Sequence, residues 1–230
     1  MLPQRFTAPE PFVVRWSNHD RPLDKLGANK SGPISRNDLE VRNLGRREIR
    51  IAGFGGQGVV LSGQIVGKAA AVHDGGFATF TQSYGPEARG GACTAEVVVS
   101  DEPIDYPYVT NPRVQIILSQ AAYAKYGREL PADAITIVDP DLVKLDPDHD
   151  PPPLSIPATR MAREMGRVVV ANIIMLGFLA ATSDLISSEA LKASVLSSVP
   201  KGTEEFNSKA FGLGHDYGGN PVARSEGNDG

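Results

Sequence analysis

The sequence predicts an α/β sandwich built on a largely parallel β-sheet. Two observations lead to this fold class. A glycine-rich turn at residues 53–58 follows a short alternating strand and precedes a long helical segment. Beyond it, short apolar strand segments keep alternating with helical segments, the arrangement typical of parallel sheets with helical crossovers. With 230 residues and 41% hydrophobic content, the chain is long and apolar enough for one sizeable core.

The first strand, turn and helix organise the chain. Ile49 and Ile51 alternate with charged residues, which is the period of a strand. Residues 53–58 then fit the pattern G-x-G-x-x-G, with one additional glycine, and a segment long enough for about four helical turns follows. Glycines permit positive φ and close approach of a ligand. The start of the helix offers free N–H groups and a partial positive charge, which suit a phosphate or carboxylate.

The same pattern has two other interpretations. A dinucleotide site also needs an acidic residue near the end of the second strand. Asp74 lies at a plausible sequence distance but falls in the turn before that strand, and the strand's end at residues 83–85 has no carboxylate. Simple NAD binding is therefore disfavoured. The second interpretation, a tight strand-to-helix turn that binds no ligand, is also compatible with the glycine pattern.

The remaining elements follow from periodicity and from capping and turn residues. Strands are expected at residues 77–84, 94–100, 114–118 and 134–138. Helices are expected at residues 120–129, 157–165, 168–182 and 188–199, and from Thr203 through Ala210. The chain then divides into an extended arm at residues 1–45, an α/β domain at residues 46–214 and a flexible tail at residues 215–230.

The arm has its own composition. Residues 1–45 are rich in Pro, Asn, Gly and Arg, with an excess of basic over acidic residues and a few apolar ones such as Phe12 and Trp16. Such a segment cannot easily pack on itself. Because Trp and Arg often anchor interfaces, we expect the arm to lie across a partner rather than to be a disordered leader.

Two glycine-rich loops are expected at one edge of the sheet. Ligands of α/β sheets bind at the carboxyl ends of strands. Residues 53–58 follow the first strand and residues 85–91 follow the second, so parallel strands would bring both loops together. The second loop carries Arg89, whose guanidinium could hold a carboxylate or phosphate with paired hydrogen bonds. A surface ion pair between Arg89 and Glu87 is an equally good interpretation of the spacing.

Composition excludes several classes of function. The net charge of −4 gives no reason to expect nucleic acid, and no apolar run is long enough to cross a membrane. The N-terminus lacks the apolar segment of a secretory signal, so a cytoplasmic location is the default. Cys93 is the single cysteine, which excludes an internal disulfide and an iron–sulfur cluster held by this chain alone. The four histidines lie in turns or tails, so no metal site and no catalytic set are expected in this chain alone.

Several segments resemble the gamma subunit of 2-oxoacid:acceptor (ferredoxin) oxidoreductases. They occur in the family's order and at its spacing over residues 48 to about 214, and the long leader departs from the family pattern. They are residues 53–58, 81–91, 118–126, 157–159, 172–177, 200–201 and 205–211.

The resemblance implies a fold, a reaction and partners. The fold would be the three-layer α/β/α Rossmann-like sandwich of the family's gamma domain. The enzyme would oxidatively decarboxylate a 2-oxoacid to an acyl-CoA and pass electrons to ferredoxin or another acceptor, as in anaerobic metabolism. Alpha, beta and delta-type subunits would carry thiamine diphosphate, Mg²⁺ and iron–sulfur clusters, while CoA would be a co-substrate. The cofactor would supply the carbanion chemistry, and this chain would supply orientation and electrostatics.

The resemblance also assigns a binding role to both loops. It implies that they help to form the CoA or substrate pocket, with the 2-oxoglutarate branch slightly favoured over aromatic 2-oxoacids such as phenylglyoxylate. The alternative is a nucleotide-binding module or NAD(P)-dependent oxidoreductase that acts alone. The candidate binding residues are Gly53, Gly55, Gly56, Gln57, Gly58, Ser83, Tyr84, Glu87, Arg89 and Gly90.

Overall fold

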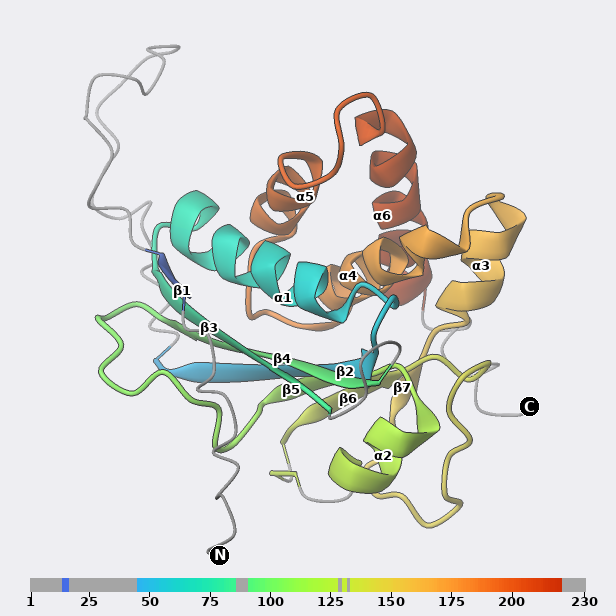
Figure 1. The fold of residues 1–230 in the computed structure, drawn as a ribbon, viewed down its shortest axis with the longest axis horizontal. Coiled ribbons are helices and arrows are strands. Elements are labelled where there is room, and N and C mark those ends of the chain that lie inside the picture. The colour runs from blue at the N-terminus through green and yellow to red at the C-terminus, as the bar shows by residue number, and fades with distance from the viewer. Residues whose placement is uncertain (1–13, 17–44, 86–90, 128–129, 132, 221–230) are drawn as a thin grey trace, which may run out of the picture.

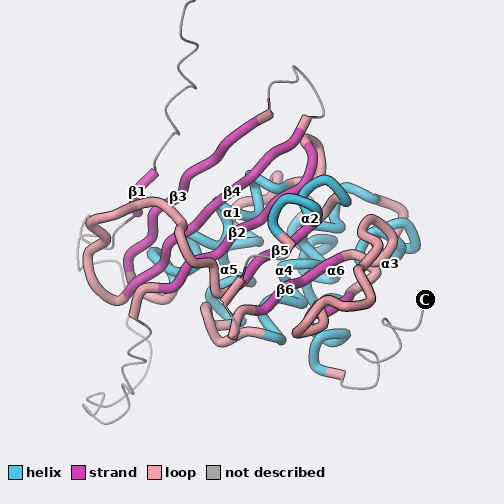
Figure 2. Tube along the Cα trace, turned by 90° about the horizontal axis from the view of Figure 1, so that it is seen from below, coloured by secondary structure: helices cyan, strands magenta, loops and turns pink. Residues whose placement is uncertain are grey.

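The computed structural model describes residues 14–16, 45–85, 91–127, 130–131 and 133–220. Their strands form one seven-stranded sheet in the order β1-β3-β4-β2-β5-β6-β7 (Figures 1 and 2). The strand bounds are β1 Val14–Trp16, β2 Arg47–Phe54, β3 Phe77–Tyr84, β4 Ala92–Ser100, β5 Val114–Ile117, β6 Ile135–Val138 and β7 Leu154–Ser155.

The sheet is mixed, in an α/β fold that confirms the expected class. Strands β2, β5, β6 and β7 pair in parallel, whereas β4 runs antiparallel between β2 and β3. Since β3 is antiparallel to β4 as well, β3 points in the same direction as β2. Five of the seven described strands therefore point in one direction, as expected for a largely parallel sheet, whereas β1 and β4 run against them. β4 does so because only a short loop connects it to β3.

Helices cover both faces of the sheet unequally. Figure 1 shows α1, α4, α5 and α6 on one face and α2 on the other, which gives the three layers. The bounds are α1 Val59–Lys68, α2 Gln120–Tyr126, α3 Ala158–Glu164, α4 Ala171–Thr182, α5 Ser188–Leu196 and α6 Glu204–Gly219, with a π-helical turn η3 at Ala69–His73 and a 3-10 turn η4 at Val168–Val170.

The main core lies between the sheet and the larger helical layer. Ile49 and Ile51 of β2 are fully buried beside Phe80 of β3 and Ile65 of α1, in the cluster that also contains α4. A smaller cluster under α2 contains Ile117 and its neighbours. The hydroxyl oxygen of Ser119 accepts the backbone N–H of Ala122 at 3.1 Å, so Ser119 is the N-cap of α2.

Helices α4 and α6 pack with their backbones in close contact. A Cβ atom placed on Gly177 would lie 2.0 Å from the carbonyl oxygen of Phe211, and one on Gly214 would lie 1.9 Å from that of Ile174. The predicted end of the last helix at Ala210 and the predicted start of a flexible tail at residue 215 are wrong, because α6 continues to Gly219. The late glycines are packing residues of a helix rather than signals of its end.

Glu48 holds the loop before β5 against the start of β2. Its buried carboxylate accepts the backbone N–H groups of Thr110 and Asn111, each at 2.5 Å, and pairs with Arg46. Burial alone would raise the pKa of this carboxyl, but the two N–H groups and the guanidinium outweigh it, so that the pKa is lowered. Arg46 also donates to the carbonyl oxygens of Tyr106 and Tyr108, which fixes a longer part of the loop.

We expect Glu48→Gln to lower the free energy of unfolding by about 1–3 kcal/mol at pH 7, because buried N–H groups lose a charged acceptor. A lowered pKa stabilises the fold above the unfolded-state value of about 4.3, and this contribution disappears as pH falls through the folded-state pKa. Urea unfolding of the full chain from pH 7 down to pH 3.5 measures both effects, with the exposed Glu102→Gln as control. Equal pH dependence in wild type and Glu48→Gln would contradict the assignment.

Only four residues of the N-terminal arm are described, and one of them, Gly45, adjoins the α/β domain. Val14, Arg15 and Trp16 form β1, which pairs antiparallel with Phe80, Thr79 and Ala78 of β3 at the edge of the sheet. The arm therefore touches its own domain at this point. What the rest of residues 1–45 contact lies outside the described residues, as do residues 221–230 of the predicted tail.

Candidate functional site

The glycine turn at the carboxyl end of β2 is held by its own glutamine. The side-chain oxygen of Gln57 accepts the backbone N–H of Phe54 at 2.6 Å, and its amide nitrogen donates to the carbonyl oxygen of Leu118 at 2.7 Å. Gln57 thus connects the ends of β2 and β5. A Cβ on Gly53 would lie 2.5 Å from the Gln57 oxygen, so Gly53 leaves the space that this clamp needs. Both residues were candidate ligand contacts, and the structure shows that both shape the turn.

The later glycines of the turn divide into two kinds. Gly58 has φ of 76°, and a Cβ there would lie 2.4 Å from the amide nitrogen of Asn172, so its conformation and its space both require glycine. Gly56 also has positive φ, but nothing lies within 4 Å of a Cβ placed on it. Gly55 and Gly56 are exposed, and α1 begins directly after Gly58 with no side-chain cap and no acidic residue in its first turn. The exposed part of the turn can therefore receive an anion at its backbone.

The second loop meets this turn at the same edge of the sheet. The backbone N–H of Gly55 donates to the carbonyl oxygen of Gly91 at 2.9 Å, and that of Gly85 donates to Ala92 at 2.7 Å. This confirms, for the described ends of the loops, that the two lie together. Ser83 and Tyr84 are exposed at the end of β3, with Tyr84 64% exposed. The candidates Glu87, Arg89 and Gly90 lie outside the described residues.

Asp74 has a structural role. Its carboxylate accepts the backbone N–H of Ser187 at 2.8 Å and the hydroxyl of the same residue at 2.6 Å. Ser187 in turn caps α5 by accepting the N–H of Ala190 at 3.1 Å. Asp74 therefore ties the end of the η3 turn to the start of α5, a structural role that agrees with the prediction that it is not the acidic residue of a dinucleotide site.

A pocket of about 400 Å³ lies beside the glycine turn, between the carboxyl ends of β2, β5 and β6 and the α3–α4 corner. No prediction from the sequence included this pocket. Asp139, at the end of β6, is 1% exposed and lines the pocket wall. Burial raises the pKa of its carboxyl, although it accepts the N–H groups of Thr159 at 2.7 Å and Asp141 at 2.9 Å. Its place after a buried strand could have marked it as a residue of this edge.

Neither a metal cluster nor a membrane span is found in the described part of the chain. No three His, Cys, Asp or Glu side chains come close enough there to hold a metal ion. No helix within the described ranges has the length and hydropathy that a bilayer crossing requires.

Comparison with known proteins places this α/β chain in a class of oxidoreductase subunits. The family described as pyruvate ferredoxin/flavodoxin oxidoreductase matches residues 48–217. The chain belongs to this family, and it corresponds to the gamma subunit of 2-oxoacid:ferredoxin oxidoreductases.

Individual relatives make the comparison more specific. The 2-oxoglutarate synthase subunit KorC of Methanocaldococcus jannaschii is 50% identical over 174 residues, which cover 74% of this chain and 93% of the relative. The subunit of the same name from Methanothermobacter marburgensis is 47% identical over 178 residues, covering 74% of this chain and 96% of the relative. The crystal structure of the keto/oxoacid ferredoxin oxidoreductase gamma subunit from Geobacter sulfurreducens has a TM-score of 0.68 at 38% identity, covering 78% of this chain and 98% of that one.

Proposed function

We propose that this chain is the gamma subunit of a multi-subunit, thiamine-dependent enzyme that oxidatively decarboxylates 2-oxoglutarate to its acyl-CoA. The observation that carries the choice of substrate is the similarity to two subunits named for 2-oxoglutarate synthase, at 50% and 47% identity over nearly their whole length. An aromatic 2-oxoacid such as phenylglyoxylate is the second candidate. An independent NAD(P) enzyme is disfavoured, because Asp74 is engaged in capping a helix.

The edge formed by the two glycine loops is the proposed binding surface for CoA or substrate. The exposed Gly56 lies beside the uncapped start of α1, next to Gly55, whose N–H already donates to Gly91. Ser83 and Tyr84 are exposed at the end of β3. Gly53, Gln57 and Gly58 support the site by fixing the turn. Within residues 86–90, Arg89 would hold an anionic group, with Glu87 and Gly90 beside it.

Alpha, beta and delta-type sister subunits are the proposed partners. Large apolar side chains are exposed near the loops, including Phe54, Tyr84, Val168 and Val169, and a covering subunit would remove them from water. The sister chains would hold thiamine diphosphate, Mg²⁺ and the iron–sulfur clusters, since a single cysteine cannot ligate a cluster. Ferredoxin or another acceptor would take the electrons in the cytoplasm. The arm of residues 1–45 would add contacts to a sister chain.

The test is to purify this chain together with its sister subunits and assay the complex on a panel of oxoacids. We expect thiamine diphosphate and iron in the complex and CoA-dependent reduction of ferredoxin with 2-oxoglutarate. Turnover of phenylglyoxylate in preference to 2-oxoglutarate would correct the substrate. A chain that purifies alone and binds NAD(P)H at micromolar concentration would overturn the proposal.

A further inference from the structure

A second cavity, of about 730 Å³, lies where β2 begins. It is lined by residues 45–46, 100–106 and 110, and Figure 1 shows the loop after β4 beside the start of β2. Because β2 runs from this end toward the glycine turn, the cavity lies at the opposite edge of the sheet from the two glycine loops. We call it the amino-edge cleft, and the function proposed above makes no use of it.

The wall of the amino-edge cleft is fixed by hydrogen bonds from the start of β2. Arg46 donates to the carbonyl oxygens of Tyr106 and Tyr108 at 2.6 and 2.7 Å, and Glu48 accepts the N–H of Thr110. Both tyrosine side chains nevertheless stay exposed, at 54% and 37%. A fixed loop that presents aromatic rings to water is suited to binding a further chain segment, and aromatic faces attract cationic side chains.

The described lining of the cleft is acidic. Asp101, Glu102 and Asp105 bring three carboxylates, all on exposed residues. Arg46 is the basic residue among the described lining, but its guanidinium is already paired with the carboxylate of Glu48. Neither Glu102 nor Asp105 forms an ion pair in the described part of the chain. The cleft therefore favours a positively charged occupant.

The register of the sheet brings both ends of one arm segment to this cleft. Trp16 pairs with Ala78 of β3, which pairs with Val99 of β4. Val99 also pairs with Arg47, so one row of the sheet joins the end of β1 to the start of β2. Three strand spacings, about 14 Å, separate these two ends. The chain leaves the sheet after residue 16 and returns through Gly45, which lines the cleft, so residues 17–44 are far longer than the gap requires.

The middle of that segment has the charge that complements the cleft. Residues 17–44 lie outside the described residues, so their place is inferred from their two ends and their composition. Residues 25–37 contain Lys25, Lys30 and Arg36 and no acidic residue, which gives three positive charges for the three carboxylates. They also contain Leu26 and Ile34, apolar side chains that can cover the exposed aromatic rings.

We propose that residues 25–37 of the arm bind in the amino-edge cleft of their own chain, with Lys25, Lys30 and Arg36 on the carboxylates of residues 101–105. The inference goes beyond the proposed function, because the cleft lies at the edge of the sheet opposite to the surface proposed for CoA or substrate. It leaves residues 1–13 as the part of the arm that reaches a sister chain.

The test joins lysine amines to carboxylates in the complex purified through this chain. A carbodiimide activates a carboxylate, and an adjacent amine displaces the activated group, which forms an amide with net loss of water. We expect peptides that link Lys25 or Lys30 to Asp101, Glu102 or Asp105. In a complex assembled from isotopically labelled and unlabelled chains, each linked pair should carry one label only. Links of these lysines to other copies or to sister chains alone, or no link to residues 101–105, would overturn the inference.

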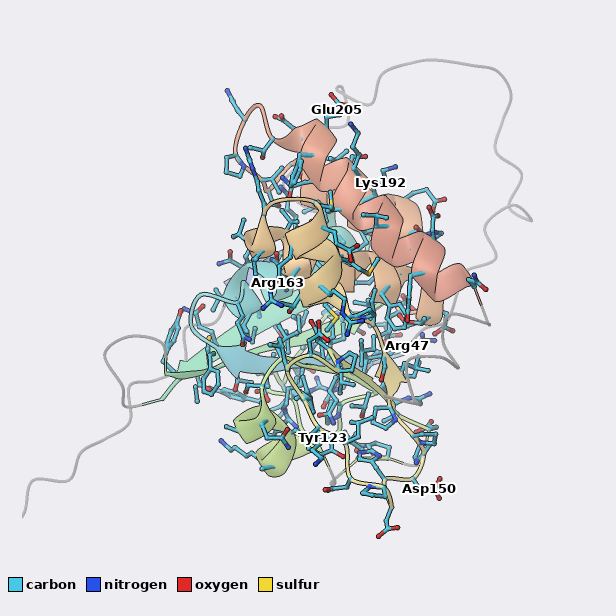
Figure 3. The ribbon with its side chains drawn as sticks, turned by 90° about the vertical axis from the view of Figure 1, so that its right-hand side faces the viewer. Arg47, Tyr123, Asp150, Arg163, Lys192 and Glu205 are labelled. Carbon is cyan, nitrogen blue, oxygen red and sulfur yellow. The ribbon has the colours of Figure 1, made fainter. Side chains whose placement is uncertain are left out.

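Charge reversal gives a second measurement. In Lys25→Glu with Lys30→Glu, tryptic cleavage after Arg36 should become about fivefold or more faster, because the released segment is open to the protease. Lys192→Glu with Lys201→Glu is the matched control, since both lysines are exposed and Lys192 lies in the helical layer, apart from Arg47 at the start of β2 (Figure 3). The control should keep the wild-type rate. Equal cleavage after Arg36 in wild type and in the arm variant would contradict the binding of the arm in the cleft.

Discussion

Gly214→Ala is expected to destabilise the domain by about 3 kcal/mol or more. The added Cβ would lie 1.9 Å from the carbonyl oxygen of Ile174, and because that atom belongs to the backbone of α4, no side chain can rotate away. Helices α4 and α6 must separate, which opens the core around Phe178 and Phe211. A loss of this size is a large fraction of the 5–15 kcal/mol that stabilises a typical domain.

Gly212→Ala is the matched control for this prediction. Gly212 lies in the same helix, but nothing is within 4 Å of a Cβ placed there. Since alanine favours a helix over glycine, this variant should gain roughly 0.5–1 kcal/mol. Urea unfolding of the full chain measures both. Similar effects of the two substitutions would show that the close contact of α4 and α6 does not carry the stability assigned to it.

Arg89→Ala is expected to have the largest effect on the reaction. If Arg89 holds the anionic end of CoA or of the oxoacid, the assembled enzyme loses a charged hydrogen-bond partner, at a cost of roughly 1.5–3 kcal/mol. The KM for that ligand should rise about tenfold to a hundredfold, or turnover should fall by a similar factor. Steady-state kinetics on the purified complex, with CoA and oxoacid varied separately, identify which ligand Arg89 contacts.

Arg113→Ala provides the comparison for Arg89. Arg113 pairs with Asp133 at 2.9 Å, and both side chains are more than half exposed. It directly precedes β5, so it lies at the other end of this strand from the glycine loops. Exposed pairs of this kind contribute about 0–1 kcal/mol. This variant should keep wild-type kinetics. If Arg89→Ala behaves like Arg113→Ala, the second loop has no part in ligand binding, and the glycines serve packing alone.

Local sequence signals were sufficient to predict the double-loop edge. Strong backbone preferences are found in the turn at Gly53–Gly58 and in the glycines at the two ends of the second loop. The two loops meet at Gly55 and Gly91 because β2 and β3 point in the same direction. The direction of β4 could also have been predicted from the sequence, because the loop expected at residues 85–91 is too short for the crossover that a parallel neighbour requires.

The end of α6 and the pocket were missed for a different reason. Glycines at residues 212, 214, 218 and 219 normally indicate the end of a helix, and only the approach of α4 explains why Gly214 continues one. The pocket carries no local signal, because it depends on which strand ends and helices surround it. Such long-range arrangements cannot be deduced from spacing in a single sequence.

The most direct test of the central claim is an experimental structure of the assembled complex with CoA bound. We predict that CoA contacts the exposed turn at Gly55 and Gly56 and the loop that carries Arg89, at an edge that faces the thiamine-bearing subunit. A structure in which CoA binds entirely to other chains, while this edge faces solvent, would contradict the account.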